Sequence, residues 1–143
     1  MDISKKITNP KFIQLSSTYH IFMPGLSGGK MSSSEPNSYI ALTDSPSEVE
    51  NKIRKYAFSG GQKTLEEHRK KGGNPDVDVS FQYLKMFFEP SDEKLKKIHE
   101  DYKSGKMTTG ELKDYTIKKI NDFLREHQKR REKAKGRIGD FLK

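Results

Sequence analysis

The sequence predicts a mainly α-helical fold, in which a helix bundle follows a short piece made of one strand and a loop. Apolar residues recur at helical spacing from residue 46 onward, and capping signals precede the periodic segments. A run rich in Gly, Lys and Ser separates them from a β-branched, aromatic stretch nearer the N-terminus. We therefore divide the chain into two parts, residues 1–44 and residues 45–143.

The first part contains one predicted strand. Residues 13–23 are rich in β-branched and aromatic side chains, and the turn-forming pair Pro24 and Gly25 follows them. The strand would lead directly into the Gly-rich loop. Because a lone strand is not stable, it needs neighbouring strands that this chain does not obviously supply.

The first two helices are delimited by caps and glycines. Ser45 can cap a helix that starts at Pro46 and ends before Gly60. Thr64 has the spacing of a capping box and opens a shorter helix that ends at Gly72. Two helices therefore follow the loop.

Residues 78–88 are expected to form the central and most buried helix, which Pro90 ends. Its apolar positions are Val79, Tyr83, Met86 and Phe87. The acidic residues at its start, Asp76 and Asp78, are interpreted as helix caps and not as catalytic groups.

Two further helices complete the predicted bundle. Ser91 starts a helix that runs to Gly105, and Thr108 forms a capping box with Glu111 at the start of the longest helix. This last helix runs into a basic segment, residues 125–137, which holds seven Lys or Arg and two Glu.

The amino-acid composition limits the cellular compartment and the classes of partner that we expect for the chain. The formal net charge of +8 favours a polyanionic partner, because Lys and Arg that neutralise phosphates release counterions. The absence of Cys excludes disulfides and thiolate zinc sites, and we expect no tightly bound metal. No apolar stretch is long enough for a membrane span. We predict a soluble, cytoplasmic chain with no membrane partner.

The Gly-rich loop is the best candidate for chemistry. Its lysine offers a mobile positive charge, and its glycines let backbone N–H groups approach phosphate oxygens, so ATP is the expected ligand. A P-loop is excluded, because Pro24 replaces its first Gly and Met31 follows the lysine. A surface loop of chance composition stays possible on these residues alone. The candidate residues are Gly28, Gly29, Lys30, Met31, Ser32, Ser33 and Ser34.

The loop resembles the Lys-Met-Ser-Lys-Ser signature loop of class I aminoacyl-tRNA synthetases, with Ser33 at the fourth position. Other segments resemble the tryptophanyl-tRNA synthetases of eukaryotes and archaea, in the same order along the chain. These segments are Pro36–Ser38, Leu42–Asp44, Ala57–Gly61, Glu66–Arg69, Gly72–Asn74, Asp76–Phe81, Thr109–Lys113 and Glu126–Gln128.

The resemblance implies a two-part enzyme that joins tryptophan to its tRNA. A Rossmann-like catalytic domain forms the adenylate from ATP, whose counter-ion is Mg²⁺, and a helical domain binds the anticodon. This chain looks like the C-terminal part: residues 1–44 would end the catalytic domain and residues 45–143 would form the anticodon-binding domain. ATP and tryptophan would bind only with the missing catalytic half, so the chain alone should be inactive. Family members are usually dimers.

The resemblance also implies roles for individual residues. Lys30 would act catalytically on the leaving pyrophosphate, Phe58 would stack on an anticodon base, and Gln62, Lys63 and Lys113 would make polar or phosphate contacts. Core packing for Phe58 and a solvated position for Lys113 stay open as alternatives. The family often has an acidic residue at the place of Lys63, so a base contact by Lys63 departs from the family's pattern. The basic segment 125–137 is either solvated or in contact with the tRNA backbone.

Two other functions compete with this interpretation. The chain is alternatively a free-standing basic RNA-binding module without catalysis, or one half of a split synthetase. An ATPase is disfavoured by the failed P-loop spacing.

Overall fold

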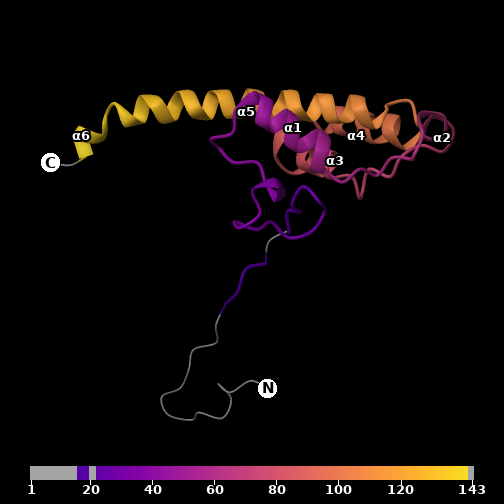
Figure 1. The fold of residues 1–143 in the computed structure, drawn as a ribbon, viewed down its shortest axis with the longest axis horizontal. Helices are drawn as coiled ribbons and strands as arrows, with labels where there is room; N and C mark the ends of the chain where they lie inside the picture. The colour runs from indigo at the N-terminus through magenta and orange to yellow at the C-terminus, as the bar shows by residue number, and fades with distance from the viewer. Residues whose placement is uncertain (1–15, 20–21, 142–143) are drawn as a thin grey trace, which may run out of the picture.

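The computed structural model describes residues 16–19 and 22–141, and these residues are mainly helical (Figure 1). The mainly α-helical prediction is therefore confirmed. A 3₁₀ turn, η2, precedes the helices, and a π-helical segment, η3, follows α3. The elements are η2 (Pro36–Ser38), α1 (Pro46–Tyr56), α2 (Leu65–Lys71), α3 (Val79–Tyr83), η3 (Leu84–Phe88), α4 (Asp92–Lys103), α5 (Thr109–Lys135) and α6 (Ile138–Phe141).

The predicted strand over residues 13–23 has no counterpart in the part of the chain that the structure describes. Residues 16–19 and 22–23 belong to no strand, and the remaining residues of the prediction lie outside the described ranges.

The helix starts follow the capping residues in the sequence. Ser45 and Thr108 each form a complete capping box, with Glu48 and Glu111 respectively, and so open α1 and α5. The Thr64 hydroxyl accepts a hydrogen bond from the Glu67 amide at the start of α2. These predicted helix starts are confirmed.

Helix α5 is the central element of the bundle, and the segment that follows α3 is not a regular α-helix. α5 packs against α1, α3, η3 and α4, and Figure 1 shows it running along the length of the molecule. The prediction that residues 78–88 form one central helix is wrong. The α-helix ends at Tyr83, and the Glu89 amide then donates to the Leu84 carbonyl five residues earlier, at 2.9 Å.

The π-helical turn changes which side chains are buried. It is wider than an α-helical turn, so side chains beyond Tyr83 lose their predicted phase. Phe87, predicted to be buried, is 68% exposed, whereas Leu84 is buried instead. Phe81, in α3 before this turn, is also buried. Met86 is only partly buried.

Two hydrophobic clusters form the core. The first joins α1, α3 and α5 and includes Leu26 from the segment before the helices. The second lies where α3 and η3 meet α4 and α5, around Tyr102 and Leu112. Each fully buried aliphatic side chain contributes about 1.5–3 kcal/mol to folding. The Gly-rich segment is thus attached to the same core as the helices.

A buried carboxylate connects three parts of the bundle. One oxygen of Asp78 caps α3 by accepting from the Ser80 amide at 2.9 Å and the Phe81 amide at 3.3 Å. The other oxygen accepts from the Gly60 amide and from the Tyr102 hydroxyl, both at 2.9 Å. The interpretation of Asp78 as a helix cap is confirmed, and the same side chain also positions the loop after α1.

A second buried carboxylate, Glu89, fixes the chain after η3 to α5. Its side chain is 1% exposed, and it pairs with the Lys119 ammonium at 2.7 Å and accepts a hydrogen bond from the Tyr115 hydroxyl. The Lys119 and Tyr115 contacts lower the pKa of Glu89 from 4.5 to about 2. Because the folded-state pKa is the lower one, this contribution to stability is complete above pH 4.5 and is lost as the pH falls toward 2.

Replacement of Glu89 by Gln should therefore destabilise the chain in a pH-dependent way. At pH 7 we expect a loss of about 1.5–3 kcal/mol in the free energy of unfolding, the usual range for a hydrogen bond to a charged group. Urea unfolding of both proteins at several pH values measures it. The difference should shrink between pH 4.5 and 2. A difference that stays constant with pH would show that the charge of Glu89 is not the cause.

Candidate functional site

The Gly-rich loop is a compact turn closed by its own backbone. The Gly25 amide donates to the Gly29 carbonyl at 2.6 Å, and the Gly28 amide donates to the Gly25 carbonyl at 2.8 Å. Gly28 has a φ of 86°, a conformation that residues with a Cβ rarely adopt. Gly28 therefore allows a backbone shape at this turn that a residue with a Cβ would strain.

The Ser38 hydroxyl closes the second half of the loop. It accepts from the Ser32 amide at 3.0 Å and lies 2.8 Å from the Glu35 carbonyl, to which it donates. The Glu35 amide donates to the Ser32 carbonyl at 3.1 Å. The backbone of Ser32 is thus held by the Ser38 hydroxyl and the Glu35 amide, so its position depends on Ser38, which was not among the candidate site residues.

Leu26 docks the loop on the helices. Its side chain is 0% exposed, its amide donates to the Ser38 carbonyl at 2.9 Å, and its carbonyl accepts from the Phe58 amide at 2.7 Å. Met31 packs against the first hydrophobic cluster. The loop is therefore held from its inner side at two points, one on each side of Lys30.

The polar side of the loop faces solvent. Gly28, Gly29, Lys30, Ser33 and Ser34 are exposed, and the Ser32 and Ser34 hydroxyls lie 2.8 Å apart. Within residues 16–19 and 22–141 no carboxylate forms an ion pair with Lys30. This arrangement leaves an ammonium group and several hydroxyls free to contact an anion.

The candidate ATP residues lie on an open surface. A pocket of about 420 Å³ adjoins the loop, but Lys30 does not line it, and Glu35 does. Its walls come from Ser27, Ser34, Glu35, Pro36, Asn37, Ser38 and Tyr56. A carboxylate repels phosphate, so this pocket is a poor match for the triphosphate on its own.

Phe58 lies between the loop and the helical bundle. Its side chain is 51% exposed, which excludes plain core packing. Its amide binds Leu26, and its carbonyl accepts from the Val79 amide at 3.1 Å. Phe58 and Gly28 help to line an open pocket of about 370 Å³. An aromatic ring that could stack on a base thus stands beside the candidate ATP loop.

The other three candidate residues for RNA contact have different surroundings. Gln62 and Lys63 are exposed in the segment between α1 and α2, and the Gln62 amide group donates to the Gly72 carbonyl at 3.0 Å. The Lys113 ammonium donates to the Arg54 carbonyl at 3.2 Å and to the Ala57 carbonyl at 3.0 Å.

Lys113 therefore caps the C-terminal end of α1, where backbone carbonyls lack helical partners. Partial burial lowers the pKa of its ammonium. The sequence contains no signal for this contact, because the residues involved are far apart along the chain.

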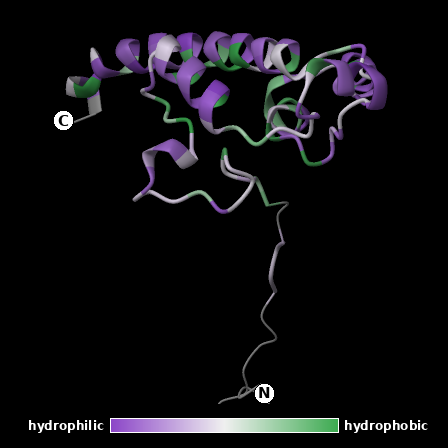
Figure 2. Ribbon diagram, turned by 45° about the vertical axis from the view of Figure 1, so that its right-hand side comes forward, coloured by the Kyte–Doolittle hydropathy of each residue, from purple (hydrophilic) through white to green (hydrophobic). Residues whose placement is uncertain are grey.

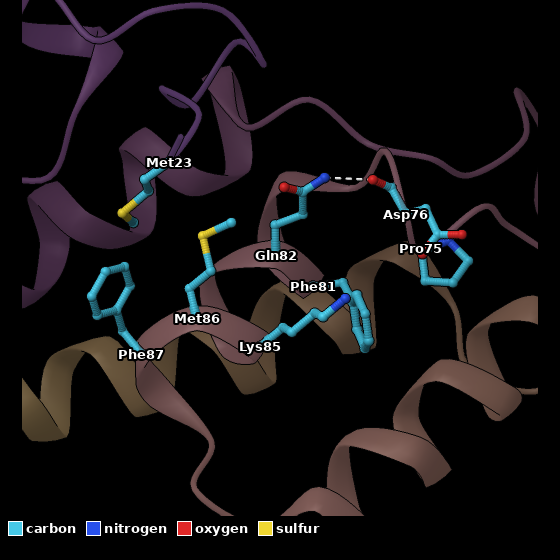
Figure 3. A pocket seen from close by; sticks show the side chains of 8 residues that line it. All are labelled: Met23, Pro75, Asp76, Phe81, Gln82, Lys85, Met86 and Phe87. Carbon is cyan, nitrogen blue, oxygen red and sulfur yellow. Dashed lines mark hydrogen bonds between the residues drawn. The ribbon is translucent and has the colours of Figure 1, made fainter. Parts of the chain in front are cut away.

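A mostly apolar pocket of about 470 Å³ opens at the end of α3 (Figure 3). Met23, Met86 and Phe87 lie on one side of the view, and Gln82 reaches the Asp76 carbonyl on the other. Its lining residues are Met23, Pro75, Asp76, Phe81, Gln82, Lys85, Met86 and Phe87. Sequence analysis missed this pocket, because it placed Met86 and Phe87 in the core of a regular helix.

Neither a metal centre nor a membrane helix is found in the described part of the chain. Among residues 16–19 and 22–141, no group of three or more His, Asp or Glu side chains is arranged to hold a metal ion. No helix formed by these residues combines the length and the apolar character needed to cross a bilayer.

A comparison with protein families matches residues 1–125 to the class I tRNA synthetases for tryptophan and tyrosine (W and Y). The match covers most of the chain and agrees with the signature loop and the helical fold described above. The chain belongs to this family of class I tRNA synthetases.

Individual relatives point to the tryptophan enzymes within this family. The chain is 58% identical over 142 residues to the tryptophan–tRNA ligase of Sulfurisphaera tokodaii, which corresponds to 98% of this chain and 36% of the relative. It is 49% identical over 139 residues to the human cytoplasmic tryptophan–tRNA ligase, covering 96% of this chain and 29% of the human protein. The family resemblance predicted from the sequence is confirmed, and the chain spans about a third of the length of these relatives.

Solved structures agree with this assignment. The tryptophanyl-tRNA synthetase of Aeropyrum pernix superposes with a TM-score of 0.79 at 43% identity, over 82% of this chain and 32% of that chain. The tryptophanyl-tRNA synthetase of Giardia lamblia superposes with a TM-score of 0.76 at 50% identity, over 79% of this chain and 28% of that chain.

The Lys113 cap gives a stability prediction. Lys113→Ala should lower the free energy of unfolding by about 1 kcal/mol, because two carbonyls at the end of α1 lose their donor. Lys118→Ala serves as control, because Lys118 is exposed on the same helix. Urea unfolding measures both variants, and equal effects would contradict the capping role of Lys113.

Proposed function

We propose that the chain carries the signature loop and the anticodon-binding domain of a tryptophan–tRNA ligase. Residues 1–44 would complete the catalytic domain, and residues 45–143 would bind tRNA. The reaction class is ATP-dependent ligation: tryptophan and ATP give the adenylate and pyrophosphate, and the tryptophanyl group then forms an ester with tRNA. The observation that carries this proposal is the exposed Lys30 on a loop docked to the helical bundle, in a chain that aligns almost completely with tryptophan–tRNA ligases.

Lys30 acts on the leaving group in this proposal. When the tryptophan carboxylate attacks the α-phosphorus, the bond to the bridging oxygen breaks and negative charge develops on pyrophosphate. The Lys30 ammonium neutralises this charge, while the hydroxyls of Ser32, Ser33 and Ser34 and the amide of Gly29 donate hydrogen bonds. Gly28, whose amide is bound to the Gly25 carbonyl, shapes the turn. Since Ser33 replaces the second lysine of the general motif, Lys30 supplies the full charge of this loop.

The helical part reads RNA in this proposal. Phe58 stacks on an unpaired anticodon base, and Gln62 and Lys63 contact base edges or phosphates. Lys113 uses two of its three N–H donors for α1, so one remains for a phosphate. This role is supported by the solvent exposure of Phe58, Gln62 and Lys63, which leaves their side chains accessible to RNA.

The remaining partners follow from the relatives. ATP, accompanied by Mg²⁺, and tryptophan require the catalytic portion that the relatives possess beyond the matched third. A homodimer and a cytoplasmic location are the arrangement that we propose for the complete enzyme. The human relative is named as a cytoplasmic enzyme.

Lys30→Ala tests the catalytic proposal in a hybrid enzyme, in which this chain replaces the matching third of the Sulfurisphaera tokodaii ligase. The rate of adenylate formation should fall about 100- to 1,000-fold, because one charge-stabilising donor contributes about 2.7–4 kcal/mol to the barrier. Tryptophan affinity should change little. Pre-steady-state pyrophosphate release measures the rate, and Lys97→Ala, at an exposed position on α4, is the control. An unchanged rate would refute the role of Lys30.

Phe58→Leu tests the RNA proposal on the 143-residue chain. Affinity for a tryptophan tRNA transcript should fall about 5- to 150-fold, since base stacking contributes about 1–3 kcal/mol. The preference over a transcript with an altered anticodon should fall as well. Phe87→Leu removes a phenylalanine elsewhere that is even more exposed, at 68% against 51% for Phe58, and should leave both quantities unchanged. Filter binding measures the affinities, and identical behaviour of the two variants would exclude Phe58 as the stacking residue.

A further inference from the structure

The end of α5 extends beyond the bundle. Its last buried residue is Leu124. Within the described residues, its last hydrogen bonds to an earlier segment come from Gln128, whose amide group donates to the Leu42 carbonyl at 3.0 Å and the Asp44 carbonyl at 3.1 Å. Every residue from 129 to 135 is exposed. Figure 1 shows this part of α5 reaching past the other helices toward α6. No core therefore explains why the helix continues.

The basic residues of this extension that form ion pairs lie on a different face of the helix from those that do not. Arg131 and Lys135 share one carboxylate oxygen of Glu132, at 3.6 and 2.7 Å. Within the described ranges, no carboxylate pairs with Lys129, Arg130 or Lys133.

At 3.6 residues per turn, Lys129, Arg130 and Lys133 fall within an arc of about 100°. We call these three residues the unpaired basic face. Since Glu132 balances only one of the two charges of Arg131 and Lys135, three of the four positive charges left on residues 129–135 lie on one side of the extension.

The composition of the extension selects among partners. A membrane-surface helix needs a broad apolar side, and a protein interface usually needs buried aromatic anchors. Residues 129–135 contain no apolar side chain except Ala134, and Figure 2 shows this part of α5 as mostly hydrophilic. Lys and Arg without an apolar neighbour match a phosphate backbone, where affinity comes from counterion release.

We propose that the unpaired basic face binds the phosphate backbone of double-helical RNA, away from the residues that would read the anticodon. The inference rests on the proposed function, because it makes the helical arms of the tRNA the natural ligand. From Lys129 to Lys133 the helix rises about 6 Å, and phosphates of one strand of a duplex advance about 3 Å each along its axis, so the face spans about two phosphates. It recognises backbone, and it carries no base specificity.

Two double variants of the 143-residue chain test this proposal. Lys129→Gln with Lys133→Gln removes two charges from the unpaired basic face. Arg131→Gln with Lys135→Gln removes two charges from the paired side of the same helix and is the matched control. Gln has a helix propensity close to that of Lys and Arg, so both variants keep α5. The probes are a tryptophan tRNA transcript and a 16-base-pair RNA duplex of unrelated sequence, bound across a salt series.

The slope of log K against log salt is the readout. For both RNAs we expect the unpaired-face variant to reduce the slope by about 1.4–1.8, which corresponds to two lost phosphate contacts, and the control to change it little. Equal reductions by both variants, or no reduction by either, would overturn the proposal. Binding to vesicles of phosphatidylserine and phosphatidylcholine that depends on Lys129 and Lys133, without an effect on RNA, would assign the face to membranes and also overturn it.

The result is separable from the test of the proposed function. Loss of anticodon preference in Phe58→Leu depends on the loop after α1, whereas the slope on an unrelated duplex depends on α5 alone. If anticodon preference is absent from the unmodified chain but the slope difference remains, the proposed function fails and the unpaired basic face stands. If the preference is present and the slopes are equal, only the face is wrong.

Discussion

The buried carboxylate of Asp78 is the constraint on which the arrangement of the candidate site depends. A charged group removed from water must be matched by donors, and here four donors from three segments converge on it. They set the start of α3, the position of Gly60 and the approach of α4 through Tyr102. Backbone hydrogen bonds extend from this site toward the loop. The Val79 amide donates to the Phe58 carbonyl, and the Phe58 amide donates to the Leu26 carbonyl. A continuous series of hydrogen bonds thus links the interior of the bundle to the Gly-rich loop.

This link gives the loop two different sides. Leu26 and Met31 attach its inner side to the hydrophobic core, while Lys30 between them remains exposed. Such an anchored loop can present a charge in a defined place and still leave the ammonium free to reach a ligand. Because Phe58 shares the anchor, the candidate ATP residues and the candidate base-stacking residue are positioned by the same contacts. The helical part is therefore a support for the loop as well as a proposed RNA-binding surface.

Local features of the fold were predictable from the sequence, and long-range ones were not. Helix starts could be predicted from Ser45, Thr108 and Asp78, because an N-cap side chain accepts hydrogen bonds from amides only two or three residues further on. The π-helical turn at Leu84–Phe88 escaped prediction, since apolar periodicity alone does not distinguish an i to i+5 hydrogen bond from a regular helix. The cap that Lys113 places on α1 joins residues more than 50 positions apart. The loop residues were found from their Gly, Lys and Ser composition and given a role through their resemblance to a family, whereas their anchoring by Ser38 and Leu26 required the structure.

Amide hydrogen exchange on the 143-residue chain tests most directly whether the loop is anchored by its inner side and free at Lys30. The amides of Leu26 and Phe58 should exchange as slowly as the core amide of Leu112, because both donate to backbone carbonyls in the described fold. The Lys30 amide, which lies at the exposed side, should exchange at the rate of an unstructured segment. Exchange of Leu26 and Phe58 as fast as that of Lys30 would contradict the account, because the loop would then be detached from the bundle.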